Sequence, residues 1–204
     1  MTEHNHTQFG AQFAAVAAAI RDRRTIKEFS DQPVPHELIT ALIDLAIWAP
    51  NHKLTEPWRF YVIDGAGRDR VSELARTLRY KKLLSTGAEE SVAARKAAEF
   101  AADWAKVPAI VYVTQVVAPD PFVEREDYGA VCCAVQNLML GAQAAGLASF
   151  WGTGDLAQAR PLADLVGAGE NERMVGLIRL GYAAAGVKAP IKRTSAAKFT
   201  RWVE

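Results

Sequence analysis

The spacing of apolar residues along the chain predicts helices that alternate with short strands. Apolar side chains recur at helical spacing over residues 9–20, and this stretch ends at a group of arginines. A second amphipathic helix follows Pro35, a residue suited to a helix start, and stops at Pro50. Residues 58–63 are dense in aromatic and β-branched side chains, which is typical of a strand.

The next stretch, residues 67–106, is rich in Ala, Arg, Lys and Glu, with apolar residues at roughly helical intervals. We expect two helices here, broken near residues 85–87. Their charges are expected to form a solvated face and not a binding patch. Because the stretch lies between two site-like regions, the pattern leaves open whether it serves as a mobile cap.

The second half of the chain predicts further strands around a long helix. Residues 108–117 are an almost continuous run of apolar β-formers, as expected of a strand buried on both faces. The elements expected after it are a polar loop over residues 120–127, a long helix ending at Gly146, a strand over 148–151, a helix over 156–166 and a strand over 174–180.

These elements predict an α+β architecture, with one central mixed sheet flanked by helices. The strands alternate irregularly with helices, and none is followed by the Gly-x-Gly-x-x-Gly turn of a dinucleotide-binding unit. Neither an internal repeat nor a linker is visible. We therefore expect a single domain over residues 1–204, of which residues 1–8 form a flexible tail.

Composition narrows the classes of partner. The formal net charge is +1 and 23% of the residues are charged, so no strong field recruits nucleic acid or an anionic membrane. No segment reaches the ~20 apolar residues of a membrane span. Cys132 and Cys133 are adjacent and would diverge on a helix, so we expect two small buried residues without a disulfide. This cysteine usage favours a reducing, cytoplasmic location.

Familiar catalytic and metal-binding motifs are missing from the sequence. It contains no Gly-x-Ser-x-Gly elbow, His-Glu-x-x-His, phosphate-binding loop or Cys-x-x-Cys pair. Of the 4 histidines only His52 lies in a plausible site, and a lone loop histidine is more often a surface residue than a catalyst. We expect no metal and no catalytic side chain. The sequence instead favours chemistry supplied by an organic cofactor.

Two segments suit such a cofactor in phosphorylated form. Arg23, Arg24 and Lys27 surround the hydroxyl of Thr25, and charge-assisted, bidentate bonds from such a group fix both the charge and the orientation of a phosphate dianion. Residues 48–63 then offer a turn, an aromatic side chain and an imidazole before a strand. By itself the Arg-Arg-Thr run would more often be a solvated helix end.

Four segments, taken in order, resemble the nitroreductase family of FMN-dependent oxidoreductases, in particular its compact single-domain branch. The segments are Arg23-Arg24-Thr25 with Lys27, the Ala-Pro-Asn-His-Lys turn through Pro57-Trp58, the helix over residues 130–146 with Phe-Trp-Gly-Thr-Gly over 150–154, and Leu-Gly-Tyr over 180–182. Each is weak alone, but their order and separations are fairly specific, and they span most of the chain.

The resemblance implies an intertwined homodimer with FMN in a cleft between the subunits. The residues that it assigns to the phosphate and ribityl end are Arg23, Arg24 and Thr25, helped by Lys27 and completed by Lys192 or Arg193. Those assigned near the flavin ring are Trp48, Pro50, Asn51 and His52, with His52 approaching from the partner, and Trp151, Gly152 and Thr153 along the isoalloxazine. For Trp151, a place as an ordinary core aromatic is an equally open interpretation.

Two departures from the family pattern bear on substrate range. Leu54 stands where larger family members have asparagine, and Glu56 stands where glutamine usually precedes Pro-Trp. A carboxylate near a flavin would disfavour the anionic reduced ring unless it points away or pairs with Arg59.

The function implied is hydride transfer from NADH or NADPH to flavin N5, and from there to a nitroaromatic, quinone or activated alkene in a ping-pong cycle. The alternatives left open are a flavin-dependent dehydrogenase or dehalogenase-type enzyme on the same fold, and a non-catalytic flavin-binding dimer. The sequence does not choose between NADH and NADPH, because it contains no dinucleotide fold.

Overall fold

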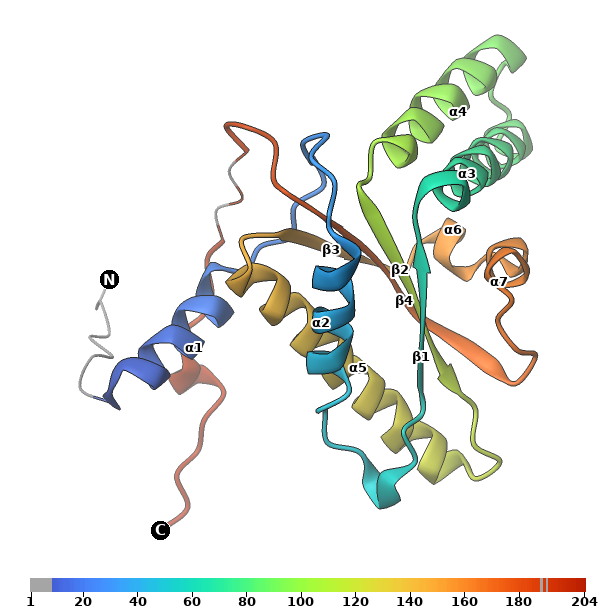
Figure 1. Ribbon diagram of the computed structural model, residues 1–204. Helices are drawn as coiled ribbons and strands as arrows, with labels where there is room; N and C mark the ends of the chain where they lie inside the picture. Colours follow the sequence, from blue (N-terminus) through green and yellow to red (C-terminus); the bar gives the residue numbers. More distant parts are fainter. Residues whose placement is uncertain (1–8, 188, 190) are drawn as a thin grey trace.

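The computed structural model describes residues 9–187, 189 and 191–204, so the tail expected over residues 1–8 lies outside the described part (Figure 1). In chain order the elements are α1 (Ala11–Asp22), α2 (His36–Ala46), the 3-10 turn η2 (His52–Leu54), β1 (Trp58–Ile63), α3 (Gly65–Ser85), α4 (Glu90–Ala105), β2 (Ala109–Val116), α5 (Pro121–Ala144), β3 (Ala148–Gly152), α6 (Asp155–Gln158), α7 (Arg160–Val166), β4 (Glu172–Gly181) and η3 (Ala196–Lys198).

The strands form a sheet in the order β1-β2-β4-β3, and each neighbouring pair is antiparallel. The expectation of a mixed sheet is therefore wrong for these strands. The physical reason is visible between β1 and β2, where α3 and α4 form a helical hairpin that returns the chain to the end of the sheet it left. Ile63 consequently pairs with Ile110. A parallel contact occurs only as an isolated bridge, between Thr25 and Ser149, within the described residues.

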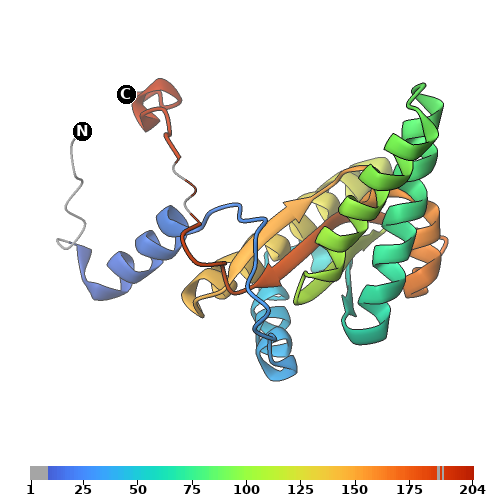
Figure 2. The same cartoon turned by 90° about the horizontal axis from the view of Figure 1, so that it is seen from above.

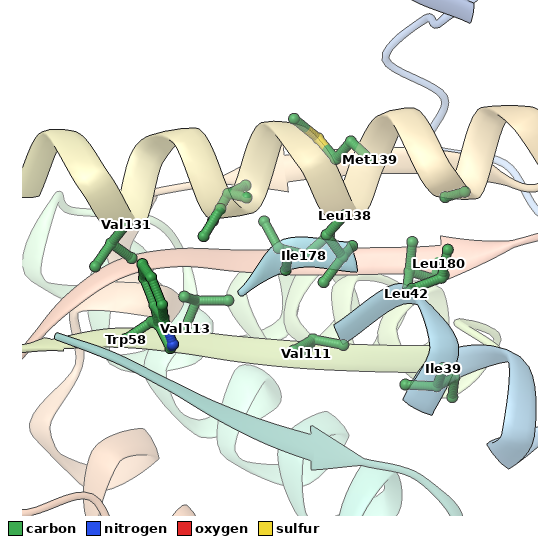
Figure 3. Close-up of a cluster of buried hydrophobic side chains, with 14 of the residues drawn as sticks. Ile39, Leu42, Trp58, Val111, Val113, Val131, Leu138, Met139, Ile178 and Leu180 are labelled. Atoms are coloured by element: carbon green, nitrogen blue, oxygen red, sulfur yellow. The ribbon is translucent and has the colours of Figure 1, made fainter. Parts of the chain in front are cut away.

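Helices cover both faces of the sheet and create two cores. Alternation along β2 sends Val111 and Val113 to one face and Ile110 and Tyr112 to the other, and all four are buried. The first face packs against α2 and α5, as Figure 3 shows for Leu138 of α5 above the strands. The second face packs against α3, α4, α6 and α7. The strand expected to be buried on both sides is confirmed.

The central helix α5 begins earlier than the sequence pattern predicts. A polar loop was expected over residues 120–127, but Pro121 opens the helix and the side chain of Asp120 caps it, accepting from Phe122 N at 2.7 Å. The polar residues that suggest a loop lie instead on the first turns of a 24-residue helix. The expected end near Gly146 is confirmed, since Gly146 has φ +78° just beyond the helix.

The helix expected over residues 156–166 is divided into α6 and α7. Ala159 is extended, with φ −70° and ψ 123°, and it separates the two helices. The cause is Pro161, which has no N–H to donate to the preceding turn and whose ring would clash with it. By contrast, the break expected near residues 85–87 is confirmed: α3 ends at Ser85 and Gly87 has φ +83°.

Two features lie outside the helix-covered sheet. Figure 2 shows α1 and the C-terminal segment projecting from the body, and no residue of α1 is buried. The α3–α4 hairpin, called the helical arm below, extends beyond the sheet at the other end (Figure 1).

Both cysteines on α5 are free. Cys132 is half-buried and Cys133 is exposed, so the expected burial is wrong for Cys133, because consecutive helical residues point about 100° apart.

Candidate functional site

The cationic segment Arg23–Lys27 is fixed to the sheet by its backbone. It follows α1 directly, and Ile26 N donates to the carbonyl of Ser149 at 3.1 Å. Ser149 is buried and belongs to β3, the last strand in the order of the sheet. The last residue of the segment, Lys27, places its Nζ 5.5 Å from the centre of the Phe150 ring. Two stretches that are far apart in sequence, 23–27 and 149–153, therefore lie side by side.

Three predicted phosphate ligands gather at the start of this segment. Burial lowers the pKa of the half-buried Arg23, and the positive charges of Arg24 and Arg193 lower it further. Arg24 donates to the carbonyls of Arg21 and Arg23 at the end of α1. Positive charges gathered around a half-buried guanidinium are electrostatically unfavourable without an anion, so this arginine cluster (Arg23, Arg24 and Arg193) is suited to a phosphate.

The side chain of Trp151 points away from Phe150, to the α5 face of the sheet. Its Nε1 donates to the carbonyl of Val175 at 3.1 Å, and its ring packs against the core there. Gly176 makes room for the ring, because a Cβ at that position would lie 2.3 Å from Nε1. The ring of Trp151 is thus a core aromatic. Its backbone, with Gly152 and Thr153, remains at the opposite face.

At that opposite face, β3 and the helical arm enclose a cavity of about 660 Å³. Gly152 and Thr153 line it, as the resemblance implies for the flavin ring. The arm contributes Leu78, Arg79, Lys82, Phe100 and Trp104, and β4 contributes Leu177 and Arg179. Sequence reasoning missed these walls. The available signal was Arg179 itself, the one charge in the apolar run over residues 174–180.

The predicted residues after α2 lie in a tight, left-handed turn. Lys53, Leu54 and Glu56 have φ of +54°, +55° and +44°, a region that favours glycine. The side chain of Asn51 closes the turn, since its Oδ1 accepts from Glu56 N at 3.1 Å. Pro50 is exposed just before it. Asn51 therefore has a structural role within its own chain.

Side chains attach this turn to the first half of α5. Thr55 Oγ1 donates to Oδ1 of the buried Asp127 at 2.6 Å, and His52 Nδ1 lies 3.7 Å from Glu126 Oε2. Trp48, in contrast, is 84% exposed and covers little of its own chain. Arg59, named above as a possible partner of the Glu56 carboxylate, bonds instead to the backbone, since its Nη1 donates to the Glu56 carbonyl at 3.2 Å. Within the described residues the Glu56 carboxylate has no ion pair.

A single chain does not bring all the predicted site residues together. The 23–27 segment contacts the start of β3, which follows the C-terminal end of α5, whereas the His52 turn contacts Glu126 and Asp127 near its N-terminal end. Asp127 and Ala144 lie 17 positions apart on α5. This corresponds to about 26 Å at 1.5 Å per residue.

The described residues contain neither a cluster of metal ligands nor a helix able to span a membrane. No three His, Cys, Asp or Glu side chains lie close enough together there to hold a metal ion. None of the described helices combines the length and apolarity needed to cross a membrane.

Comparison with known proteins identifies similar chains. The sequence model of the Nitroreductase family matches residues 20–182. YfhC of Bacillus subtilis, which bears the name of an NAD(P)H nitroreductase, is 28% identical over 172 residues, covering 84% of this chain and 86% of that protein. The crystal structure of a nitroreductase-like protein from Bacillus cereus has a TM-score of 0.78 and 28% identity, covering 93% of this chain and 96% of the other.

A second solved structure extends the likeness in fold. The FMN-dependent nitroreductase NfnB from Mycobacterium smegmatis, in complex with NADPH, has a TM-score of 0.74 at 22% identity and covers 95% of this chain and 100% of the other. The predicted α+β, nitroreductase-like fold is confirmed by these matches.

Proposed function

This chain belongs to the nitroreductase family, and on that premise we propose that it is an FMN-dependent oxidoreductase that takes hydride from NADH or NADPH. The acceptor would be a small molecule, of the nitroaromatic, quinone or activated-alkene class. The single observation that carries the proposal is the arginine cluster beside β3, next to a cavity lined by Gly152 and Thr153. The relatives named above support the donor and the cofactor.

The residues present fit the two ends of FMN. Arg23, Arg24 and Arg193 would bind the phosphate, because a dianion compensates for the burial and the repulsion that together lower the pKa of Arg23. The neighbouring cavity of about 660 Å³ falls within the range of volumes that hold small molecules. Lys27 supports the same assignment, because its Nζ lies 5.5 Å from the centre of the ring of Phe150, a residue that lines the cavity.

When bound, the flavin would supply the redox chemistry through its N5 atom. The chain's own part is then to bind, orient and exclude water. The arginine cluster would fix one end of the cofactor, and the backbone of residues 151–153 would contact the other end. The apolar walls of the cavity would strengthen the electrostatic interactions inside it by keeping water out.

We propose that the functional unit is a homodimer in which the His52 turn reaches the partner's cofactor. Two observations support this. The two groups of predicted site residues lie at opposite ends of α5 in one chain, so a second copy is needed to unite them. Large apolar side chains are also exposed over several elements, with Trp48 84%, Leu54 81% and Trp202 86% exposed. A second copy of the chain would cover them.

A non-catalytic flavin-binding dimer is the second candidate, and Glu56 is the observation in its favour. Its carboxylate has no ion pair within the described residues, and a negative charge near a flavin disfavours reduction to the anionic ring. A dehydrogenase or dehalogenase-type enzyme on the same fold would differ from the main proposal in the reaction itself, and turnover with NADH or NADPH and a nitro compound would distinguish them.

The decisive experiment is a visible spectrum of purified protein that has been incubated with FMN, desalted and then mixed anaerobically with NADH or NADPH. Retained flavin that bleaches is the expected result. Retained flavin that stays oxidised would favour the non-catalytic dimer or another electron donor. Loss of flavin on desalting would contradict the proposal as a whole.

The phosphate assignment is tested by Arg24→Glu, with Lys96→Glu as the matched control on the exposed surface of α4. We expect Arg24→Glu to lose FMN on desalting while its circular dichroism spectrum stays that of the wild type. Lys96→Glu should keep FMN. Full retention of flavin by Arg24→Glu would overturn the assignment of the arginine cluster.

A further inference from the structure

A guanidinium without an acidic partner forms one wall of the cavity. Arg179 projects from β4, with its Cζ 3.9 Å from the centre of the Trp104 ring and 4.7 Å from that of Phe150. Its Nε is shielded from solvent and has no acceptor. Within the described part of the chain, the guanidinium of Arg179 makes no hydrogen bond or ion pair. Two aromatic faces therefore hold this cation in place, but no anion neutralises it.

Such an arrangement is costly for the protein alone. Burial lowers the pKa of Arg179, and the negative charge of Asp103 offsets this effect without coming within ion-pair distance. Cation–π contacts return part of the lost hydration but do not replace a carboxylate. Leu177, two residues earlier on the same face of β4, shows that an apolar side chain packs well here. The charge of Arg179 is therefore not explained by stability.

The rest of the cavity wall has the same character. Arg79 lies over the Phe100 ring at 5.8 Å, and Lys82 is paired with Asp155. The lining thus contains three cations against one carboxylate, set among aromatic and aliphatic side chains. A flat, apolar ligand with one negatively charged substituent would match these walls. Its ring system would contact the aromatic side chains, and its substituent would pair with Arg179.

We propose that Arg179 is a specificity-determining residue that selects an aromatic acceptor carrying a carboxylate, such as a nitrobenzoate. The inference rests on the proposed function and narrows its acceptor class. Gly152 and Thr153 line the same cavity, so an acceptor held by Arg179 shares its walls with the residues assigned to the cofactor. The guanidinium fork suits a carboxylate because it donates two parallel hydrogen bonds.

The test compares 4-nitrobenzoate with its neutral analogue 4-nitrobenzamide. Binding to the oxidised holoprotein is measured by calorimetry, and kcat/KM is measured with NADH or NADPH. We expect the wild type to prefer the carboxylate by about tenfold or more in both measurements, the scale of one charge-assisted contact. Arg179→Met should abolish this preference mainly through KM, and Arg179→Lys should restore part of it. Arg173→Met, an exposed arginine on the same strand, is the matched control.

The outcomes separate the two proposals. Equal binding of the acid and the amide by the wild type overturns the role of Arg179 even if flavin is bound and reduced. It is also overturned if Arg179→Met keeps the preference and changes only the reduction potential of the bound FMN, since the cation would then serve the cofactor. Failure of the proposed function appears instead as absence of flavin reduction, while calorimetry still reports whether the anion is preferred. If Arg179→Met does not fold, the wild-type comparison decides.

Discussion

The hydroxyl of Thr55 donates a hydrogen bond over 2.6 Å to the carboxylate of Asp127, and Asp127 is only 3% exposed. This bond joins the left-handed turn after α2 to the first half of α5. Three non-glycine residues of the turn, Lys53, Leu54 and Glu56, have positive φ, and each costs on the order of 1–3 kcal/mol. The attachment to Asp127 therefore stabilises a strained turn that carries His52.

Thr55→Val is expected to lower the free energy of unfolding by about 1–3 kcal/mol, because it leaves the buried carboxylate of Asp127 without its donor. FMN retention should fall as well if the turn serves the partner's site. Urea unfolding and flavin content after desalting are the two measurements. Thr40→Val is the control, since among the described residues the Thr40 hydroxyl bonds only to the carbonyl of His36 on the surface of α2. An unchanged free energy of unfolding for Thr55→Val would show that the turn is stable without the bond to Asp127.

Gly176→Ala is expected to displace the Trp151 ring, because the new Cβ would lie 2.3 Å from Nε1. Overpacking of this kind costs about 1–3 kcal/mol. Thermal unfolding and tryptophan fluorescence would report the loss of stability and the movement of the ring. A second change, Trp151→Leu, frees the space, so the double variant should be destabilised by less than the sum of the single changes. Strict additivity would mean that the two positions do not compete for space.

Alkaline pH is expected to destabilise the protein through Tyr61. Its hydroxyl lies 2.8 Å from both oxygens of Glu172, and burial together with this hydrogen bond raises the pKa of Tyr61 to about 12. An unfolded tyrosine has a pKa near 10, so between about pH 10 and 12 the unfolded chain has lost a proton that the folded chain keeps. Unfolding is thereby favoured as the pH rises through this range.

The check on this sign is the melting temperature of wild type and Tyr61→Phe between pH 9 and 11. The fall in melting temperature should be smaller for Tyr61→Phe, which has no phenol to titrate. At acidic pH the pair of Tyr61 and Glu172 affects stability through Glu172, and stability is then lost as the pH falls. Burial raises the pKa of Glu172, but hydrogen bonds from Thr114, Tyr61 and Gly169 lower it overall, so their stabilisation is lost as Glu172 protonates. Parallel curves for both proteins at alkaline pH would contradict the assignment.

Val16→Asp is expected to convert a homodimer into monomers. No residue of α1 is buried, and Val16 and Ile20 are 58% and 51% exposed on its apolar stripe. A charge there opposes burial against a second copy of the chain. Light scattering after size exclusion would give the mass, and flavin content would follow it downward. Leu84→Asp, at an exposed apolar position on the helical arm, should leave the mass unchanged. A wild-type monomer would end the dimer proposal.

Sequence patterns located most of the elements because the signals involved are local. Alternation and β-branching marked residues 58–63 and 108–117 as strands, and glycine and proline chemistry marked the break near 85–87 and the end of α5 near Gly146. The patterns failed where a local signal had two meanings. Polar residues over 120–127 suggested a loop, but the cap provided by Asp120 turned them into the start of α5.

The candidate site, too, could be predicted from the sequence only in part. The cations of residues 23–27 were visible in the sequence, because three positive charges and a hydroxyl stand within five consecutive residues. Their meeting with Arg193 and with Ser149 depends on backbone pairing between segments more than a hundred residues apart. No local pattern contains that information.

The sequence by itself determined the family, the α+β class and the cationic segment, because hydrophobic periodicity and the order of motifs are properties of the sequence that do not depend on tertiary contacts. Only the tertiary structure decided that the sheet is antiparallel, that the His52 turn and the arginine cluster lie at opposite ends of α5, and that Arg179 lies between Trp104 and Phe150. The physical reason is that strand register and helix packing are set by burial summed over the whole chain.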